Sequence, residues 1–317
     1  MDLKSNFSSA CAKKIFGNSD RATEFLLHLQ KARGFSLPMR TMLRGKNSGQ
    51  TRLDLANSDI WTKVVENWDY DCALPIIREM FTETEKYESG KNSHKMMKLL
   101  LDEWEYLKLG TVDWPFSQGA FDDFVQGVNA QKTDGPTKDE RVRKAAVQYR
   151  RIKEINAVRN DYIETLIFEK NKNVLPTLRH GRLVDFFISG KSFDQKVSRG
   201  PTNEFKKEFG VKWKSHAIEH PEVVAEYLYS FQDEGRFGAD SRLLVVYLDP
   251  DVSIDEITSI IEKTDLQDPL EVTFVYSHEN QDEKMTYKVT CFVILLYSPD
   301  PPESPSEMIA GETVEAN

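Results

Sequence analysis

The chain has 317 residues, of which 39% are hydrophobic and 29% charged. This length is sufficient for one large domain or two ordinary ones with a sizeable core. No apolar run reaches the ~18 residues that span a bilayer, since the longest is Val289–Tyr297, and the N-terminus lacks the apolar stretch of a secretory signal. The three cysteines are far apart in the sequence, which favours neither a disulfide framework nor a zinc site. We therefore expect a cytoplasmic protein that is not associated with a membrane.

The net charge of -9 hides an uneven distribution. Residues 1–138 hold 19 basic and 19 acidic side chains, residues 139–216 hold 18 and 10, and residues 217–317 hold 5 and 22. Within the first block, residues 1–65 hold 11 basic side chains against 5 acidic ones. Because an electrostatic field depends on where the charge is located, these two basic segments are compatible with a polyanionic partner.

The first 138 residues are expected to form a mainly helical N-terminal region. Apolar residues recur at helical spacing in Asp20–Lys31 and in Ser93–Leu107, and Ser93 is a candidate N-cap of the second helix. Between these helices, Ser36–Arg52 is a basic, glycine-containing loop. Leu109–Lys138 is rich in turn-forming residues and is interpreted as a connector that ends the region at residue 138.

Residues 139–297 are expected to form an α/β sandwich with a mixed sheet. A long helix is predicted over Asp139–Lys170, with further helices over Pro221–Phe231 and Ser253–Lys263. Strands are predicted over Asn173–Leu178, Leu183–Ile188, Ser192–Ser198, Leu243–Asp249, Leu270–Tyr276 and Thr286–Tyr297, the fourth buried on both faces and the last two forming a hairpin. The acidic, proline-rich segment 298–317 cannot bury a core and is predicted to be a disordered tail.

One predicted hairpin gathers the polar side chains that could carry chemistry. If residues 190–191 form a two-residue type II′ turn, Asp185 lies across from Lys196, and Phe187 lies across from Asp194. Because side chains alternate along a strand, these four would share one face. The opposite, apolar face would consist of Val184, Phe186, Ile188, Phe193 and Val197, with Gln195 among them.

Two carboxylates and an ammonium group would thus lie close together. Carboxylates from neighbouring strands suit Mg²⁺, with Mn²⁺ as a substitute, because Mg²⁺ often binds through one or two carboxylates together with substrate phosphate. The ammonium group could orient or help to deprotonate an attacking water, or stabilise charge on the phosphate. This combination predicts metal-assisted hydrolysis of a phosphodiester, and the basic segment around it would attract the polyanion.

The arrangement of Asp185, then Asp194-Gln195-Lys196 after a hairpin, resembles the PD-(D/E)xK nuclease superfamily, whose best-known members are type II restriction endonucleases. The predicted order of helix, three strands, helix and strand also resembles the core of that superfamily, over residues 139–249. The resemblance implies that Asp185 and Asp194 are metal ligands, that Lys196 is the catalytic lysine, and that Glu164 is an additional acid at the metal. The chain departs from the pattern in having Val184 in place of proline, a short spacing between the two acids, and Asp194 in place of the commoner glutamate.

The resemblance further implies a fold like that of restriction endonucleases and a Mg²⁺-dependent endodeoxyribonuclease, most simply a site-specific type II restriction enzyme. Such an enzyme would cut double-stranded DNA as a homodimer, with the helical N-terminal region supplying dimer or DNA contacts. Basic residues that could contact DNA are found in the N-terminal loop, on the long helix and after the hairpin: Arg40, Arg44, Lys46, Arg143, Arg150 and Arg199.

Two other functions are compatible with the same residues. The superfamily core also serves nucleases that act on RNA or on branched DNA. Alternatively, the chain is a non-catalytic nucleic-acid-binding or assembly protein, in which Asp185, Asp194 and Lys196 form a cross-strand salt bridge, and Glu164 pairs with a basic residue on the helix surface. The tripeptide [DE]xK itself is weak evidence, because it occurs four times: at residues 2–4, 194–196, 204–206 and 282–284.

Overall fold

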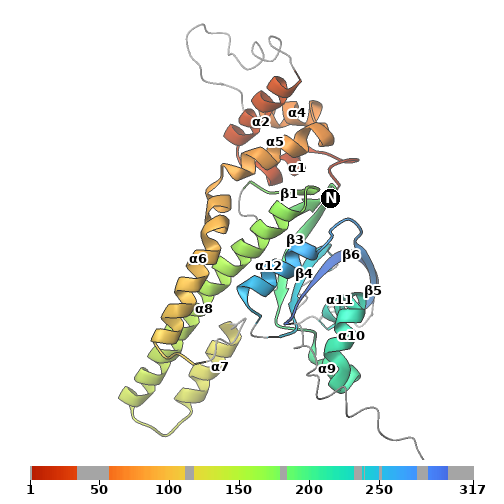
Figure 1. Cartoon of the computed structure of the whole chain (residues 1–317). Coiled ribbons are helices and arrows are strands. Elements are labelled where there is room, and N and C mark those ends of the chain that lie inside the picture. Colours follow the sequence, from red (N-terminus) through yellow and green to blue (C-terminus); the bar gives the residue numbers. More distant parts are fainter. Residues whose placement is uncertain are drawn as a thin grey trace, which may run out of the picture.

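The protein has a mixed α/β fold with a six-stranded mixed sheet (Figure 1). The computed structural model describes residues 2–33, 57–110, 118–178, 184–231, 238, 240–249, 252–276 and 285–298. The helices are α1 (Ser9–Phe16), α2 (Ser19–Ala32), α4 (Asn57–Glu66), α5 (Tyr70–Thr82), α6 (Glu85–Tyr106), α7 (Gln118–Asn129), α8 (Gly135–Lys170), α9 (Asn203–Phe209), the 3₁₀ helix η1 (Gly210–Lys212), α10 (Trp213–Glu219), α11 (Pro221–Ser230) and α12 (Ile254–Lys263). The strands are β1 (Val174–Pro176), β2 (Phe186–Ile188), β3 (Lys191–Ser198), β4 (Arg242–Tyr247), β5 (Leu270–Tyr276) and β6 (Met285–Leu296).

The sheet has the strand order β1-β2-β3-β4-β6-β5. Strands β1, β2 and β3 form an antiparallel meander, whereas β3 is parallel to β4, and β4 is parallel to β6. A parallel neighbour requires a crossover connection, and helices α9 to α11 provide it between β3 and β4. Strands β5 and β6 are antiparallel, so the mixed sheet and the final hairpin are confirmed as predicted.

Helices cover both faces of the sheet. On one face, Ile163 of α8 and Ile257 of α12 share a core with Leu243 of β4. On the other face, Val224 of α11 shares a core with Leu244 of β4. All six residues of β4 are buried, and the five after Arg242 alternate between the two cores, which confirms the predicted strand that is buried on both faces.

A third core lies where the N-terminal helices meet the edge of the sheet. It joins side chains of α1, α2, α4 and α5 to Leu175 of β1 and Phe187 of β2. Arg78 of α5 strengthens this contact, because its guanidinium donates hydrogen bonds to the carbonyls of Phe168 and Val174 at 2.9 and 2.5 Å. Helices α1, α2, α4 and α5 are therefore packed against the first strands of the sheet.

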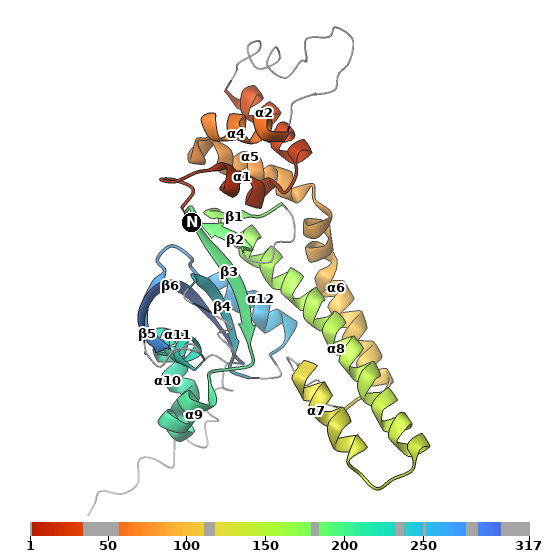
Figure 2. The ribbon, with the colours of Figure 1, turned by 180° about the vertical axis from the view of Figure 1, so that it is seen from behind.

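Two long helices, α6 and α8, run side by side and extend beyond the sheet (Figure 2). The carboxylate of Asp134 caps α8 by accepting a hydrogen bond from the N–H of Thr137 at 2.9 Å, so the helix starts four residues before the predicted Asp139. The two helices lie close together at Gly90, where an added Cβ would lie only 1.7 Å from Oγ1 of Thr165. A residue with a side chain could occupy this position only if Thr165 or the helices shifted.

The start of α6 differs from the prediction. The N-cap is Thr84, whose hydroxyl accepts a hydrogen bond from the N–H of Tyr87 at 3.2 Å. Ser93, the predicted N-cap, lies inside the helix and donates its hydroxyl proton to the carbonyl of Ser89 at 2.8 Å. The polar residues of the first two turns conceal the helix in the sequence, because their side chains show no apolar periodicity.

Two further helical segments were not predicted. The presumed connector 109–138 contains α7, which packs on α8 with the rings of Phe121 and Tyr149 stacked at 5.2 Å. Residues 203–219 form α9, η1 and α10. The predicted helices that correspond to α2, α11 and α12 are confirmed.

Other predictions concern residues outside the described ranges. The basic loop 36–52 and residues 299–317 of the expected tail lie outside them. Within the described ranges, no helix combines the length and the apolar character that a membrane crossing requires.

Candidate functional site

The turn between β2 and β3 sets the position of the candidate site. Ser189 and Gly190 occupy the turn with φ angles of 51° and 93°, which are the values of a type I′ turn. The predicted type II′ turn at residues 190–191 is therefore wrong by one residue. Phe187 lies across from Ser192 and not across from Asp194. When a hairpin turn shifts by one residue, the cross-strand partner of each residue changes by two positions, so each side chain stays on the same face of the sheet.

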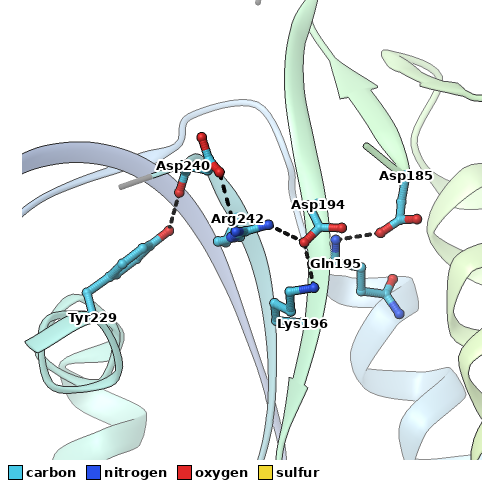
Figure 3. Close-up of polar contacts among 7 residues, drawn as sticks. All are labelled: Asp185, Asp194, Gln195, Lys196, Tyr229, Asp240 and Arg242. Atoms are coloured by element: carbon cyan, nitrogen blue, oxygen red, sulfur yellow. Dashed lines mark hydrogen bonds and ion pairs between the residues drawn. The ribbon is translucent and has the colours of Figure 1, made fainter. Parts of the chain in front are cut away.

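Asp194 is the buried centre of an ion-pair network on β3. Its side chain is 7% exposed, and its Oδ2 lies 2.7 Å from Nζ of Lys196. Arg242, at the partner position on the parallel strand β4, pairs with the same oxygen. Arg242 is also 3.5 Å from the carboxylate of Asp240, whose carbonyl accepts a hydrogen bond from the hydroxyl of Tyr229 at 2.9 Å. Two cations thus neutralise one carboxylate where β3 and β4 meet (Figure 3).

Asp185 lies directly before β2, next to β3. Its N–H donates to the carbonyl of Phe193 at 3.1 Å, and its carboxylate accepts a hydrogen bond from the N–H of Gln195 at 2.7 Å. The pKa of Asp185 is raised to about 7, chiefly by burial and also by the charges of Glu164 and Asp194, which together outweigh the lowering effect of the hydrogen bond from Gln195. Asp185 is therefore close to both other acids and binds a proton readily near neutral pH.

Asp194 and Lys196 share one face of β3, whereas Asp185 does not take the cross-strand position opposite Lys196 that the predicted register required. Figure 3 shows Asp194 between Asp185 on one side and Arg242 with Lys196 on the other. The hydrogen-bonded ladder of β2 and β3 ends at residues 186 and 193. Asp185 lies beyond that end and turns toward the backbone of β3, so strict alternation no longer sets its direction.

The predicted apolar face is confirmed in part. Phe186, Ile188 and Phe193 are buried in the core beneath α8, and Val197 packs against that core. Val184 instead joins the core formed with the N-terminal helices. It precedes the regular part of β2, and the alternation that places the other four does not extend to it.

Glu164 reaches the same neighbourhood from α8. Its Oε2 lies 2.6 Å from Nζ of Lys86, which comes from α6. The side chains are 14% and 8% exposed, so this is a buried ion pair. From the sequence, Glu164 could be either an additional acid at the metal or the partner of a basic residue. In the structure, it forms an ion pair with a lysine from another helix.

The candidate DNA-contacting residues are spread over the molecule. Arg143 and Arg150 are exposed on α8, and Arg150 pairs with Glu154 at 2.8 Å. Arg199 is exposed directly after β3, three residues from Lys196. Arg40, Arg44 and Lys46 lie outside the described residues. Arg199 is therefore the candidate nearest in sequence to Asp194, which together with Asp185 and Glu164 forms the acid cluster.

Sequence reasoning missed two basic residues, Arg242 and Lys86. Arg242 begins the apolar strand β4, and Lys86 is one of several charged residues in the first turns of α6. Both are distant in sequence from the acids that they pair with. Only the pairing of β3 with β4 and the packing of α6 on α8 bring them into the site.

The donor atoms of the cluster fit a hard divalent cation. Asp185 and Asp194 offer carboxylate oxygens, which Mg²⁺ prefers. The amide oxygen of Gln195, next to Asp185, is buried and accepts no hydrogen bond from the described residues. Within those residues, no group of three His, Cys, Asp or Glu side chains converges as a complete metal site, so water and substrate oxygens would have to complete the coordination.

Comparison with known proteins adds no relative. No protein-family model, no curated protein and no solved structure matches the chain. A proposal for the function therefore rests on the residues of the site and their geometry.

Proposed function

We propose that the protein is a Mg²⁺-dependent endodeoxyribonuclease that hydrolyses DNA phosphodiester bonds, similar to type II restriction endonucleases. One observation carries the proposal. On β3, Oδ2 of Asp194 lies 2.7 Å from Nζ of Lys196, and the carboxylate of Asp185 accepts a hydrogen bond from the backbone of the same strand. Two carboxylates can hold a divalent cation, and a lysine beside them can orient water or stabilise the phosphate, which are roles used in metal-assisted phosphodiester hydrolysis.

The chain order around these residues supports the proposal. A long helix, three antiparallel strands, helices and a strand parallel to the third follow one another from α8 to β4. This is the order that the resemblance to the PD-(D/E)xK superfamily predicts. The basic balance of residues 139–216, with 18 basic against 10 acidic side chains, would favour association with a polyanion.

Asp185 and Asp194 would hold the cation through their carboxylates. A bound Mg²⁺ supplies Lewis-acid stabilisation of charge on a phosphoryl oxygen and lowers the pKa of its water. Lys196 presents an ammonium group that can orient the attacking water or stabilise the phosphate, because its side chain is 29% exposed and reachable. Arg242, from the neighbouring strand β4, pairs with the same oxygen of Asp194 as Lys196 does and so fixes the direction of that carboxylate.

The remaining expectations belong to the same proposal. Duplex DNA is the proposed substrate, and a homodimer is the proposed assembly, because each subunit would cut one strand. Arg199 is the proposed phosphate contact nearest to Lys196 in sequence.

Incubation of the purified protein with long duplex DNA and Mg²⁺ tests the proposal. Discrete fragments indicate site-specific cutting, and a smear indicates non-specific digestion. Either product should disappear with EDTA and in Asp194→Asn. If duplex DNA stays intact while RNA or branched DNA is cleaved, the proposed substrate is wrong but the proposed phosphodiester hydrolysis holds.

A second candidate function is favoured by the ion pairs themselves. Asp194 is enclosed by Lys196 and Arg242, as expected of a structural network in a non-catalytic nucleic-acid-binding or assembly protein. Such a protein would shift DNA in a gel without cutting it and without any dependence on Mg²⁺.

A further inference from the structure

The ion pair between Lys86 and Glu164 brings the N-terminal helical region into the acid cluster. The two charged atoms lie 2.6 Å apart, and the lysine side chain is only 8% exposed. Removing a lysine from water is costly unless a fixed counter-charge is present. Lys86 is therefore held in a fixed position by its pairing with Glu164 and is not a solvated surface charge.

The packing of α6 on α8 explains how Lys86 reaches this position. Gly90 lies one turn after Lys86 on α6 and permits close contact with Thr165, the neighbour of Glu164. A Cβ at residue 90 would also lie 3.1 Å from the carbonyl of Asp161. Because residues four apart lie on the same side of a helix, the close approach at Gly90 directs Lys86 toward Glu164.

Basic side chains pair with two of the three acids of the cluster. The acids Glu164, Asp185 and Asp194 face the bases Lys86, Lys196 and Arg242. Glu164 has Lys86 as its partner, and Asp194 has the other two bases. Within the described part of the chain, Asp185 is the one acid of the three that forms no ion pair. Of the three acids, Asp185 therefore has the most to gain from a cation.

We propose that Lys86 is a positioning residue that holds Glu164 against α6, so that a divalent cation is bound by Asp185 and Asp194 without Glu164. This inference rests on the proposed function, because it assigns the ligands of the same cation site. Lys86 acts through Glu164 and through its own charge. It also links the N-terminal helices to the site, since α6 can move away from α8 only by separating the ion pair.

Unfolding by urea in EDTA tests the ion pair without any metal. Lys86→Met and Glu164→Gln should each lower the unfolding midpoint, because each leaves one buried charge unpaired. The double variant should recover most of the loss, which marks direct coupling. Lys95→Met is the matched control, because Lys95 is an exposed lysine on the same helix, and it should change neither midpoint nor metal affinity. Additive losses in the double variant would overturn the pairing.

The role of Lys86 at the cation site is tested by measuring Mn²⁺ affinity, with the free ion monitored by electron paramagnetic resonance. Lys86→Met should tighten binding by about tenfold, because a nearby positive charge is lost. Glu164→Gln should weaken it, and the double variant should bind as the wild type does. Asp185→Asn should bind far more weakly than any of these.

Three results would overturn the inference. A double variant that binds Mn²⁺ as weakly as Asp185→Asn would make Glu164 a ligand. A folded Lys86→Met variant with unchanged affinity would leave Lys86 no role at the site. A wild type without Mn²⁺ affinity would refute the proposed cation site itself, and with it this role of Lys86, whereas the first two results refute the inference alone.

Discussion

Arg242 lies at the partner position of Asp194 in the parallel ladder of β3 and β4, and its guanidinium pairs with the same carboxylate oxygen that Lys196 contacts. The arrangement gives Asp194 one fixed orientation. It also means that Lys196 is not the sole counter-charge of Asp194. The fold of this region should therefore tolerate the loss of Lys196 better than the loss of Arg242.

Replacing Arg242 should destabilise the protein through the buried charge that remains. Arg242→Ala leaves Asp194 with Lys196 alone, and we expect a loss of about 2–4 kcal/mol in the free energy of unfolding, since breaking a buried pair is costly. Lys196→Ala should cost less, because the lysine is 29% exposed. Urea unfolding of both variants measures the difference. Equal losses would show that Arg242 is not the main partner of Asp194.

Gly90 should resist substitution because of the contact between α6 and α8. Gly90→Ala would place a methyl group 1.7 Å from Oγ1 of Thr165, and forcing extra atoms into packed contacts costs about 1–3 kcal/mol. Gly127→Ala is the matched control, because Gly127 lies in helix α7 with no atom within 4 Å of the added Cβ. Alanine there should raise stability by up to ~1 kcal/mol. Thermal unfolding of the two variants compares them, and a Gly90→Ala variant as stable as the wild type would rule out the close approach.

Asp185 should make stability fall as the pH rises. Its pKa in the folded protein is about 7, above the ordinary value of 3.8, so the folded state binds more protons than the unfolded state between these values. By linkage, the free energy of unfolding then decreases with pH across this window. Asp185→Asn keeps an acceptor for the N–H of Gln195 but cannot ionise.

Asp185→Asn should therefore gain stability relative to the wild type at pH 8 and gain little at pH 4. Urea unfolding at the two pH values measures this difference. Asp134→Asn is the control of opposite sign, because hydrogen bonds from Thr137 lower the pKa of Asp134, and its carboxylate stabilises the protein at the higher pH. A wild type and an Asp185→Asn variant with parallel pH profiles would contradict the raised pKa.

Local signals in the sequence predicted much of the sheet and several helices. The capping box of Ser253 and Glu256 starts α12, and the unbroken apolar run of β4 indicates its two buried faces. These features depend on residues close together in the chain. The turn of the hairpin was misplaced because Ser189 adopts a positive φ, which is uncommon for a residue other than glycine.

The candidate site was predicted less completely because its members come from distant segments. Asp194 and Lys196 lie two residues apart on one strand, and their pairing at 2.7 Å fits the predicted alternation of side chains. Asp185 lies beyond the regular ladder, where alternation no longer applies. Lys86 and Arg242 enter through helix packing and strand order, which a single sequence does not specify.

The catalytic role of Lys196 is the central claim, and cleavage of long duplex DNA by Lys196→Ala tests it most directly. The wild type should cut DNA in Mg²⁺ or Mn²⁺ and leave it intact in EDTA. Lys196→Ala should remain folded, since Arg242 still neutralises Asp194, and should produce no fragments. A folded Lys196→Ala variant that cuts DNA at the rate of the wild type would contradict the assignment of this lysine to catalysis.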